Sequence, residues 1–106
     1  MAGRVQDMVA LITGGSSGIG RGSAERLAQE GAVVVITDLQ DAKGTQVVQA
    51  IQGAGGRCEY LHHDVTKEQA WIDVVAAIKA KHGRLDILVN NAGIGISCSE
   101  IGRAHV

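Results

Sequence analysis

The chain of 106 residues contains no proline and no phenylalanine, and its aromatic content is 2%. So few aromatic side chains limit the volume of a core, which favours a sheet packed with valine, isoleucine, leucine and alanine. No apolar run approaches the ~18 residues that a membrane span needs. The N-terminus has no apolar segment followed by a small-residue cleavage site. We therefore expect a cytoplasmic protein with no membrane partner and no secretory signal.

An excess of charge of either sign is also lacking. Ten Lys and Arg residues face eleven Asp and Glu residues, for a formal net charge of −1. This balance gives no electrostatic reason to expect nucleic acid or an anionic membrane as a partner. The two cysteines, Cys58 and Cys98, form no C-x-x-C pair and no metal-ligand spacing. We expect them to be reduced thiols.

What the sequence does have is fifteen glycines, and one glycine cluster is its most informative segment. Thr13 to Gly20 (TGGSSGIG) follows the apolar run 8–12 and opens an amphipathic helical pattern. Glycines let the backbone turn tightly and let a ligand approach it. The free N–H groups and the positive dipole end of the helix then face an anion. A strand, a glycine turn and a helix start in this order predict a diphosphate site.

The spacing of the cluster is G-x-x-x-G-x-G, with glycines at Gly14, Gly18 and Gly20. It differs from the common dinucleotide fingerprint G-x-G-x-x-G, and it lacks the Gly-Lys-Ser/Thr ending of a P-loop. Alone, such a turn is also compatible with a plain strand–helix connection. Asp38 strengthens the nucleotide interpretation, because it ends the next apolar strand at close to the ~20-residue spacing of a carboxylate that binds a ribose diol.

Strand and helix patterns alternate along the chain. Continuous apolar runs predict buried strands and 3.6-residue periods predict helices. The predicted strands are 8–13, 32–37, 57–62 and 86–89, and the predicted helices are 18–30, 41–53 and 66–83. Short links between them require parallel strands with helices on both faces. The predicted fold class is α/β, with a doubly wound parallel sheet.

Three local patterns refine the third strand and helix. Thr66 with Gln69 three positions later is a capping-box pattern, so we expect the helix to start at Thr66. Trp71 lies at the spacing of the apolar face and is expected in the core. His62 and His63 are strand neighbours that point to opposite faces, and no further ligand has a suitable spacing, so no metal site is expected.

Taken together, these motifs resemble the short-chain dehydrogenases/reductases. Residues 13–20 resemble the cofactor motif of that family, 90–93 (NNAG) its second signature, and 64–65 its adenine-contacting pair. The matches cover about residues 5–96, in the expected order. The resemblance implies a Rossmann-type sheet of strand order 3-2-1-4, truncated after the fourth strand. It is strongest toward NAD-dependent alcohol, sugar and hydroxysteroid dehydrogenases.

The resemblance also implies cofactor-binding roles. The glycine turn would shape the pyrophosphate site. Asp38 would accept hydrogen bonds from the adenosine ribose hydroxyls, and Leu39 would flank the adenine. The Asp64 side chain and the Val65 backbone would hold the adenine edge, and 91–93 would line the cofactor near the ribose. The implied cofactor-binding residues are Gly14, Ser17, Gly18, Ile19, Gly20, Asp38, Leu39, Asp64, Val65, Asn91, Ala92 and Gly93.

The expected cofactor is NAD(H) rather than NADP(H). A 2′-phosphate beside the Asp38 carboxylate would be repelled, and Ser17 stands where phosphate-preferring relatives often carry Arg or Lys. The alternative for Asp38 is a solvated loop carboxylate. Asn90 and Asn91 have a structural alternative of their own, which is to tie the fourth strand to its neighbour.

The catalytic Tyr-x-x-x-Lys pair of that family is missing. The only tyrosine, Tyr60, has Asp64 four positions later. In the family, the lysine lowers the pKa of a tyrosine that exchanges the alcohol proton. We therefore predict no catalytic residue, an NAD-binding half-domain over 1–93, and a loop or irregular tail over 94–106. Truncation, alternative splicing and a frame change all remain possible origins of that tail. Gly22 also departs from the family, which usually has a helix former there.

Three functional interpretations follow. The first is an NAD(H)-dependent oxidoreductase of alcohols and ketones, with this chain inactive by itself. The second is a non-catalytic nucleotide-binding fragment or short isoform. The third is a chain that binds nothing tightly. In each case the fourth strand would be a bare apolar sheet edge, which invites self-association and low solubility.

Overall fold

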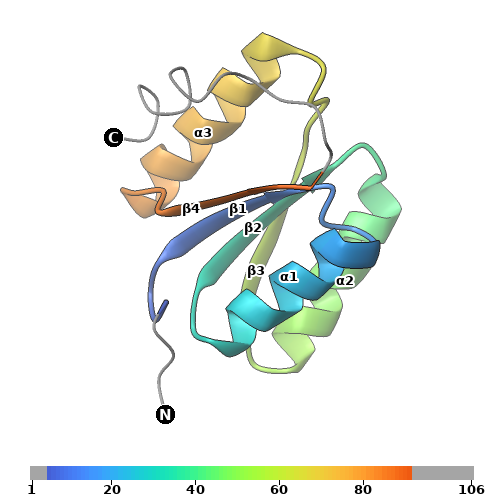
Figure 1. Cartoon of the computed structure of the whole chain (residues 1–106), viewed down its shortest axis with the longest axis vertical. Coiled ribbons are helices and arrows are strands. Elements are labelled where there is room, and N and C mark those ends of the chain that lie inside the picture. The colour runs from blue at the N-terminus through green and yellow to red at the C-terminus, as the bar shows by residue number, and fades with distance from the viewer. Residues whose placement is uncertain (1–4, 92–106) are drawn as a thin grey trace.

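The computed structural model describes residues 5–91. Its elements are β1 (Val9–Thr13), α1 (Gly18–Gln29), β2 (Val33–Asp38), α2 (Asp41–Gly53), β3 (Arg57–His62), α3 (Glu68–His82) and β4 (Ile87–Asn90). The four strands pair in parallel in the order β3-β2-β1-β4 (Figure 1). The predicted α/β class, Rossmann-type topology and strand order are confirmed.

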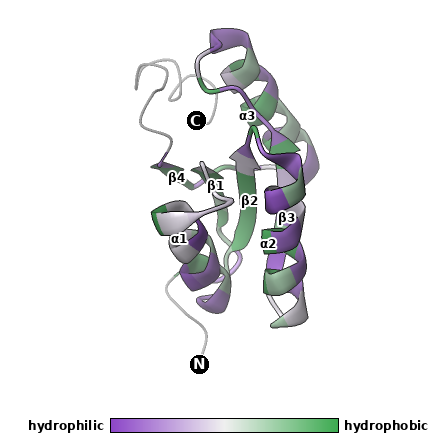
Figure 2. Cartoon of the chain, turned by 90° about the vertical axis from the view of Figure 1, so that its right-hand side faces the viewer, coloured by the Kyte–Doolittle hydropathy of each residue, from purple (hydrophilic) through white to green (hydrophobic). Residues whose placement is uncertain are grey.

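Helices cover both faces of the sheet. Helices α1 and α2 lie on one face and α3 lies on the other (Figure 1). Adjacent residues of a strand point to opposite faces, so Ile12 packs in the core under α1 and α2, whereas Leu11 packs under α3. β1 is buried at every position. Strands covered on both sides read as continuous apolar runs, as the green colour of β2 illustrates (Figure 2).

The predicted place of Trp71 in the core is confirmed, and each helix presents a buried face to the sheet. The buried residues include Ala24, Ala28, Val47, Ile51, Trp71, Val74, Val75 and Ile78. Each of the three helices is followed within two residues by a glycine with positive φ: Gly31 at +94°, Gly55 at +92° and Gly83 at +80°. A positive φ is strained for residues with a side chain, and glycine accepts it readily.

The predicted start of the third helix at Thr66 is wrong. α3 begins at Glu68, and its N-cap residue is Lys67. The Thr66 hydroxyl and backbone N–H both donate to Oδ1 of Asp64, at 2.6 and 3.0 Å. This local turn is the alternative that Asp side chains offer to a helix start. The Thr66 hydroxyl, which would cap the helix in a capping box, is instead bonded to Asp64.

Two strands are shifted by one residue from their predicted ranges. Ala32 N–H donates to the carbonyl of Leu27, which makes Ala32 part of the cap of α1, and β2 begins at Val33. β4 begins at Ile87, one residue later than predicted, and extends to Asn90. Asp86 just before it accepts a bond from Val9 N–H on its carboxylate at 2.8 Å.

Cys58 is a free, buried thiol in β3, and burial raises its pKa to about 12. Such a thiol is protonated and unreactive at neutral pH. Cys98 and the predicted tail over 94–106 lie outside the described residues. Within residues 5–91, no helix is both long and apolar enough to cross a bilayer.

Candidate functional site

The carboxyl ends of the four parallel strands meet at one edge of the sheet. In sheets of this type, ligands bind outside that edge, where the strand order reverses. Here the reversal lies between β1 and β4, since β2 and β3 extend on the other side of β1. The glycine turn follows β1, Asp38 ends β2, and Asn91 follows β4. The sequence-predicted residues are therefore grouped at one edge.

The glycine turn after β1 has the backbone that its sequence indicates. Gly14 and Gly18 have φ values of +64° and +58°. A Cβ on Gly20 would collide with the carbonyl oxygen of Gly14 and the side-chain amide of Asn91. A Cβ on Gly18 would meet nothing within 4 Å. The turn is therefore closely packed on the protein side and open on its outer side.

The N-terminus of α1 opens directly from this turn. Its N-cap residue, Ser17, makes no side-chain hydrogen bond to the helix. The first N–H groups of a helix have no partner within the helix itself. Together with the positive end of the helix dipole, such groups favour an anion. Ile19 in the first turn is 79% exposed, which gives the site an apolar side.

Asp38 connects the end of β2 to the glycine turn. Its Oδ2 accepts hydrogen bonds from the Ser16 hydroxyl at 2.5 Å and the Ser16 N–H at 3.4 Å. Its Oδ1 accepts bonds from the N–H groups of Leu39 at 2.7 Å and Gln40 at 3.2 Å. Burial raises the pKa of Asp38, but these hydrogen bonds outweigh burial and hold it below its ordinary value. The carboxylate is thus charged, oriented and half-buried, rather than a free loop carboxylate.

The asparagines at and just after the end of β4 tie this strand to β1 and its glycine turn. Asn90 accepts a hydrogen bond from the Thr13 hydroxyl at 2.9 Å, and the Asn91 amide donates to the carbonyl of Gly14 at 3.1 Å. Their predicted structural role is confirmed. Ala92 and Gly93, which were predicted to line the cofactor, lie outside the described residues.

Asp64 and Val65 lie after β3, at the same edge. Asp64 bonds to Thr66, and the Thr66 hydroxyl and N–H hold the pKa of the carboxyl below its ordinary value. The Val65 carbonyl accepts a bond from the Trp71 indole N–H at 2.9 Å. Leu39, predicted to flank the adenine, is 57% exposed. The Asp64 side chain and the Val65 carbonyl bond to Thr66 and Trp71 rather than to the glycine turn.

The two histidines diverge as predicted. His62 is exposed, and its Nδ1 lies 2.7 Å from Oδ1 of Asp41. His63 is 2% exposed, lies 3.0 Å from the Thr37 hydroxyl, and makes an edge contact with Trp71. Burial lowers the pKa of His63, so its ring is neutral. Within residues 5–91, no three potential ligands among His, Cys, Asp and Glu are grouped to hold a metal ion.

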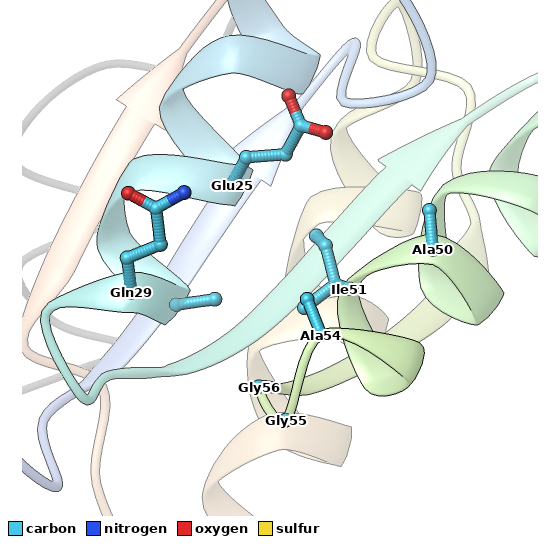
Figure 3. Close-up of a pocket in the computed structure, with 8 residues that line it drawn as sticks. Glu25, Gln29, Ala50, Ile51, Ala54, Gly55 and Gly56 are labelled. Atoms are coloured by element: carbon cyan, nitrogen blue, oxygen red, sulfur yellow. The ribbon is translucent and has the colours of Figure 1, made fainter.

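A separate pocket lies between α1 and α2, away from the glycine turn (Figure 3). It is lined by Glu25 and Gln29 of α1 and by Ala50, Ile51 and Ala54 of α2, among others. Its volume of 190 Å³ is below the roughly 300–1,000 Å³ of ordinary small-molecule sites. It also contains none of the sequence-predicted residues, so we do not place the functional site there.

Residues 8–104 match the family model described as short chain dehydrogenase. The chain belongs to the short-chain dehydrogenase family. It is 48% identical over 92 residues to a cyclopentanol dehydrogenase of Comamonas sp. (strain NCIMB 9872), covering 87% of this chain and 37% of the relative. The chain thus spans little more than a third of the length of that relative. Relatives in the family are oxidoreductases.

Solved structures of short-chain dehydrogenases share the fold of this chain. A metagenomic short-chain oxidoreductase in complex with NADP superposes with a TM-score of 0.81 at 36% identity, covering 91% of this chain and 47% of that one. A short-chain dehydrogenase/reductase from Burkholderia phymatum in complex with NAD gives 0.76 at 27% identity, covering 79% and 30%. Members of this family with the same fold therefore bind either nicotinamide cofactor.

Two residues of this edge were missed by sequence reasoning. Ser16 is 4% exposed and donates to Asp38. Its only sequence signal is its place inside the glycine turn, which it shares with Ser17. Tyr60 was considered only as a catalytic tyrosine, but its hydroxyl lies 2.7 Å from the carbonyl oxygen of Asp38. The available signal was a side-chain hydroxyl on a predicted strand.

Proposed function

We propose that this chain binds the adenosine half of NAD(H) and forms the cofactor-binding part of an alcohol or ketone oxidoreductase. The observation that carries the proposal is the Asp38 carboxylate, which is charged and bonded to Ser16 of the glycine turn. A charged carboxylate beside a helix N-terminus suited to a diphosphate supports this proposal. Its oxygens accept four bonds, from Ser16, Leu39 and Gln40, and the ribose hydroxyls would displace some of these donors. The open outer side of Gly18 leaves room for the pyrophosphate.

The choice of NAD(H) over NADP(H) rests on charge. The two structural neighbours carry different cofactors, so their likeness favours neither. A 2′-phosphate would approach the Asp38 carboxylate, and like charges at such distances repel. Ser17 supplies no positive charge to offset that repulsion. We therefore propose discrimination in favour of the cofactor that lacks the phosphate.

The proposed roles of the predicted residues follow from their places at this edge. The first turn of α1 would bind the pyrophosphate through backbone N–H groups, with Ile19 beside it. Leu39 would flank the adenine, and the Asp64 side chain and the Val65 backbone would hold its edge. Asn91 would shape the ribose site by holding the glycine turn, and Ala92 and Gly93 are proposed to continue that wall.

Chemistry on an alcohol needs groups that this sequence lacks. No Tyr-x-x-x-Lys pair occurs in the 106 residues, so no positioned acid–base is available for the alcohol proton. We propose that the chain alone binds nucleotide without turnover. The substrate class is a secondary alcohol or its ketone, as the name of the Comamonas relative suggests.

Unfolding of the chain in the presence of NAD, AMP and NADP tests the proposal. A ligand that binds only the folded state, at 100 times its dissociation constant, adds ~2.7 kcal/mol to the free energy of unfolding. We expect NAD and AMP to raise the melting temperature and NADP to raise it less. A dehydrogenase assay with cyclopentanol on the same samples should show no turnover.

Two variants sharpen this test. Asp38→Asn should abolish most of the AMP shift, because it removes the charged acceptor of the ribose hydroxyls. Asp73→Asn makes the same change on the exposed outer face of α3 and should leave the shift intact. The absence of any shift on a folded wild-type sample would refute the nucleotide site. A larger shift with NADP than with NAD would refute the cofactor choice.

A further inference from the structure

Tyr60 links three segments at the proposed ribose site. Its hydroxyl, on β3, lies 2.7 Å from the carbonyl oxygen of Asp38 and 2.5 Å from Oδ1 of Asp41. The same Asp41 oxygen lies 2.7 Å from Nδ1 of His62. The end of β2, the first residue of α2 and the middle of β3 thus converge on one hydroxyl.

The protonation states of Asp41 and Tyr60 favour a hydrogen bond between them. Hydrogen bonds from Tyr60 and then His62 hold the pKa of Asp41 below its ordinary value, so its carboxylate is charged at neutral pH. Burial and the neighbouring Asp41 raise the pKa of Tyr60, so the hydroxyl keeps its proton. A protonated hydroxyl next to a carboxylate gives a charge-assisted hydrogen bond, which is stronger than a neutral one.

The packing of the ring explains a glycine inside α2. A Cβ on Gly44 would collide with ring carbons of Tyr60. The missing side chain lets the ring lie directly against the helix backbone. This packing fixes the ring from the side opposite to the strand, so the hydroxyl has little freedom to leave its partners.

Only Leu39 and Gln40 separate the two anchored residues, Asp38 and Asp41. Both intervening N–H groups donate to Oδ1 of Asp38. The carboxylate that we assign to the ribose therefore depends on the course of this short link. The single proton of the Tyr60 hydroxyl is shared between the two ends of that link, the main-chain oxygen of Asp38 and the carboxylate of Asp41.

We propose that Tyr60 is a positioning residue for nucleotide recognition, which orients the Asp38 carboxylate by anchoring the link between β2 and α2. Tyr60 itself makes no contact with the nucleotide in this account. The inference rests on the proposed nucleotide site. It adds that ribose recognition by Asp38, on β2, depends on a residue of the neighbouring strand β3.

Calorimetric titration of the full chain with AMP and with 2′-deoxy-AMP tests this inference. Wild type should prefer AMP, because only AMP offers both ribose hydroxyls to Asp38. Tyr60→Phe keeps the ring and removes the hydroxyl, whose one proton Asp38 and Asp41 share. It should weaken AMP binding about three- to tenfold and 2′-deoxy-AMP binding less, so the preference falls toward one. A merely structural role would weaken both nucleotides equally.

Further variants separate the outcomes. Asp41→Ala should reduce the preference as Tyr60→Phe does, and Asp41→Asn, which keeps an acceptor oxygen, should restore part of it. Glu59→Gln changes the neighbouring residue, whose partners are Lys81 and His82 on α3, and should leave the preference unchanged. If wild type prefers AMP over 2′-deoxy-AMP and both Tyr60→Phe and Asp41→Ala keep that preference, the role of Tyr60 is refuted while the proposed nucleotide site stands. If wild type binds neither nucleotide, the proposed site itself is overturned.

Discussion

At the scale of single residues, the bond between Ser16 and Asp38 makes a pH-dependent contribution to stability. Because the pKa of Asp38 lies below its ordinary value in the fold, the charged carboxylate stabilises the protein above that ordinary value, and the contribution is lost as the pH falls through the folded pKa. Ser16→Ala should lower the free energy of unfolding by about 1–2 kcal/mol at pH 7. Urea unfolding at pH 7 and pH 3 should show this deficit shrink in acid. Ser17→Ala, an exposed neighbour without a side-chain cap bond, is the matched control. An equal deficit at both pH values would contradict the argument.

Of the two residues in that bond, the sequence predicted the role of Asp38 and not that of Ser16. Asp38 was predicted because it ends a run of β-branched residues at a recognisable distance from the glycine turn. Ser16 was not, because its function depends on which of two adjacent serines faces β2. That choice is made by the φ values of the turn, which the residue types alone do not determine. Tyr60 was missed for a related reason, since its partners Asp38 and Asp41 lie on other elements.

At the scale of elements, the same substitution should have opposite effects in two helices. Gly22 lies within α1, and a Cβ there would meet nothing within 4 Å. Gly22→Ala should therefore add about 0.5–1 kcal/mol of stability, the ordinary preference for alanine in a helix. Gly44→Ala in α2 should instead cost about 1–3 kcal/mol, because its Cβ would displace the Tyr60 ring. Thermal unfolding of both variants measures the pair, and a gain in stability for Gly44→Ala would refute the packing argument.

Elements were more predictable than contacts between them. The ranges of α2 and β3 match their predicted boundaries, because continuous apolar runs and helical periods depend on burial alone. The start of α3 was missed because Thr66 had two possible partners. The Thr66 hydroxyl donates to Asp64, two residues away, instead of capping the helix. Local side-chain competition of this kind is decided by small energy differences that a pattern of residue types does not show.

At the scale of the whole molecule, β4 is the edge strand of the sheet formed within residues 5–91, and it lies beside an apolar groove. The groove has a volume of 580 Å³, and its apolar lining includes Ile19, Leu27, Ile87 and Val89. Exposed strand edges with apolar side chains pair readily with other chains. We predict concentration-dependent self-association in sedimentation velocity, and Ile87→Lys should shift the chain toward monomer. Ile72→Lys, on exposed α3 surface, should not. A wild-type chain that stays monomeric at all concentrations and melts cooperatively would contradict this prediction.

The pairing of β1 with β4 sets an order of assembly during synthesis. Three bonds that join β1 and its glycine turn to the β4 segment each span 77 positions: Val9 to Asp86, Thr13 to Asn90, and Gly14 to Asn91. The last two lie at the site. By contrast, the bond between Ser16 and Asp38 spans 22 positions. Long-range pairings form later than local ones, because more chain entropy is lost in closing them. On the ribosome, the ribose carboxylate would therefore meet the glycine turn while α3 is still being made, and the last wall of the nucleotide site would arrive only with β4.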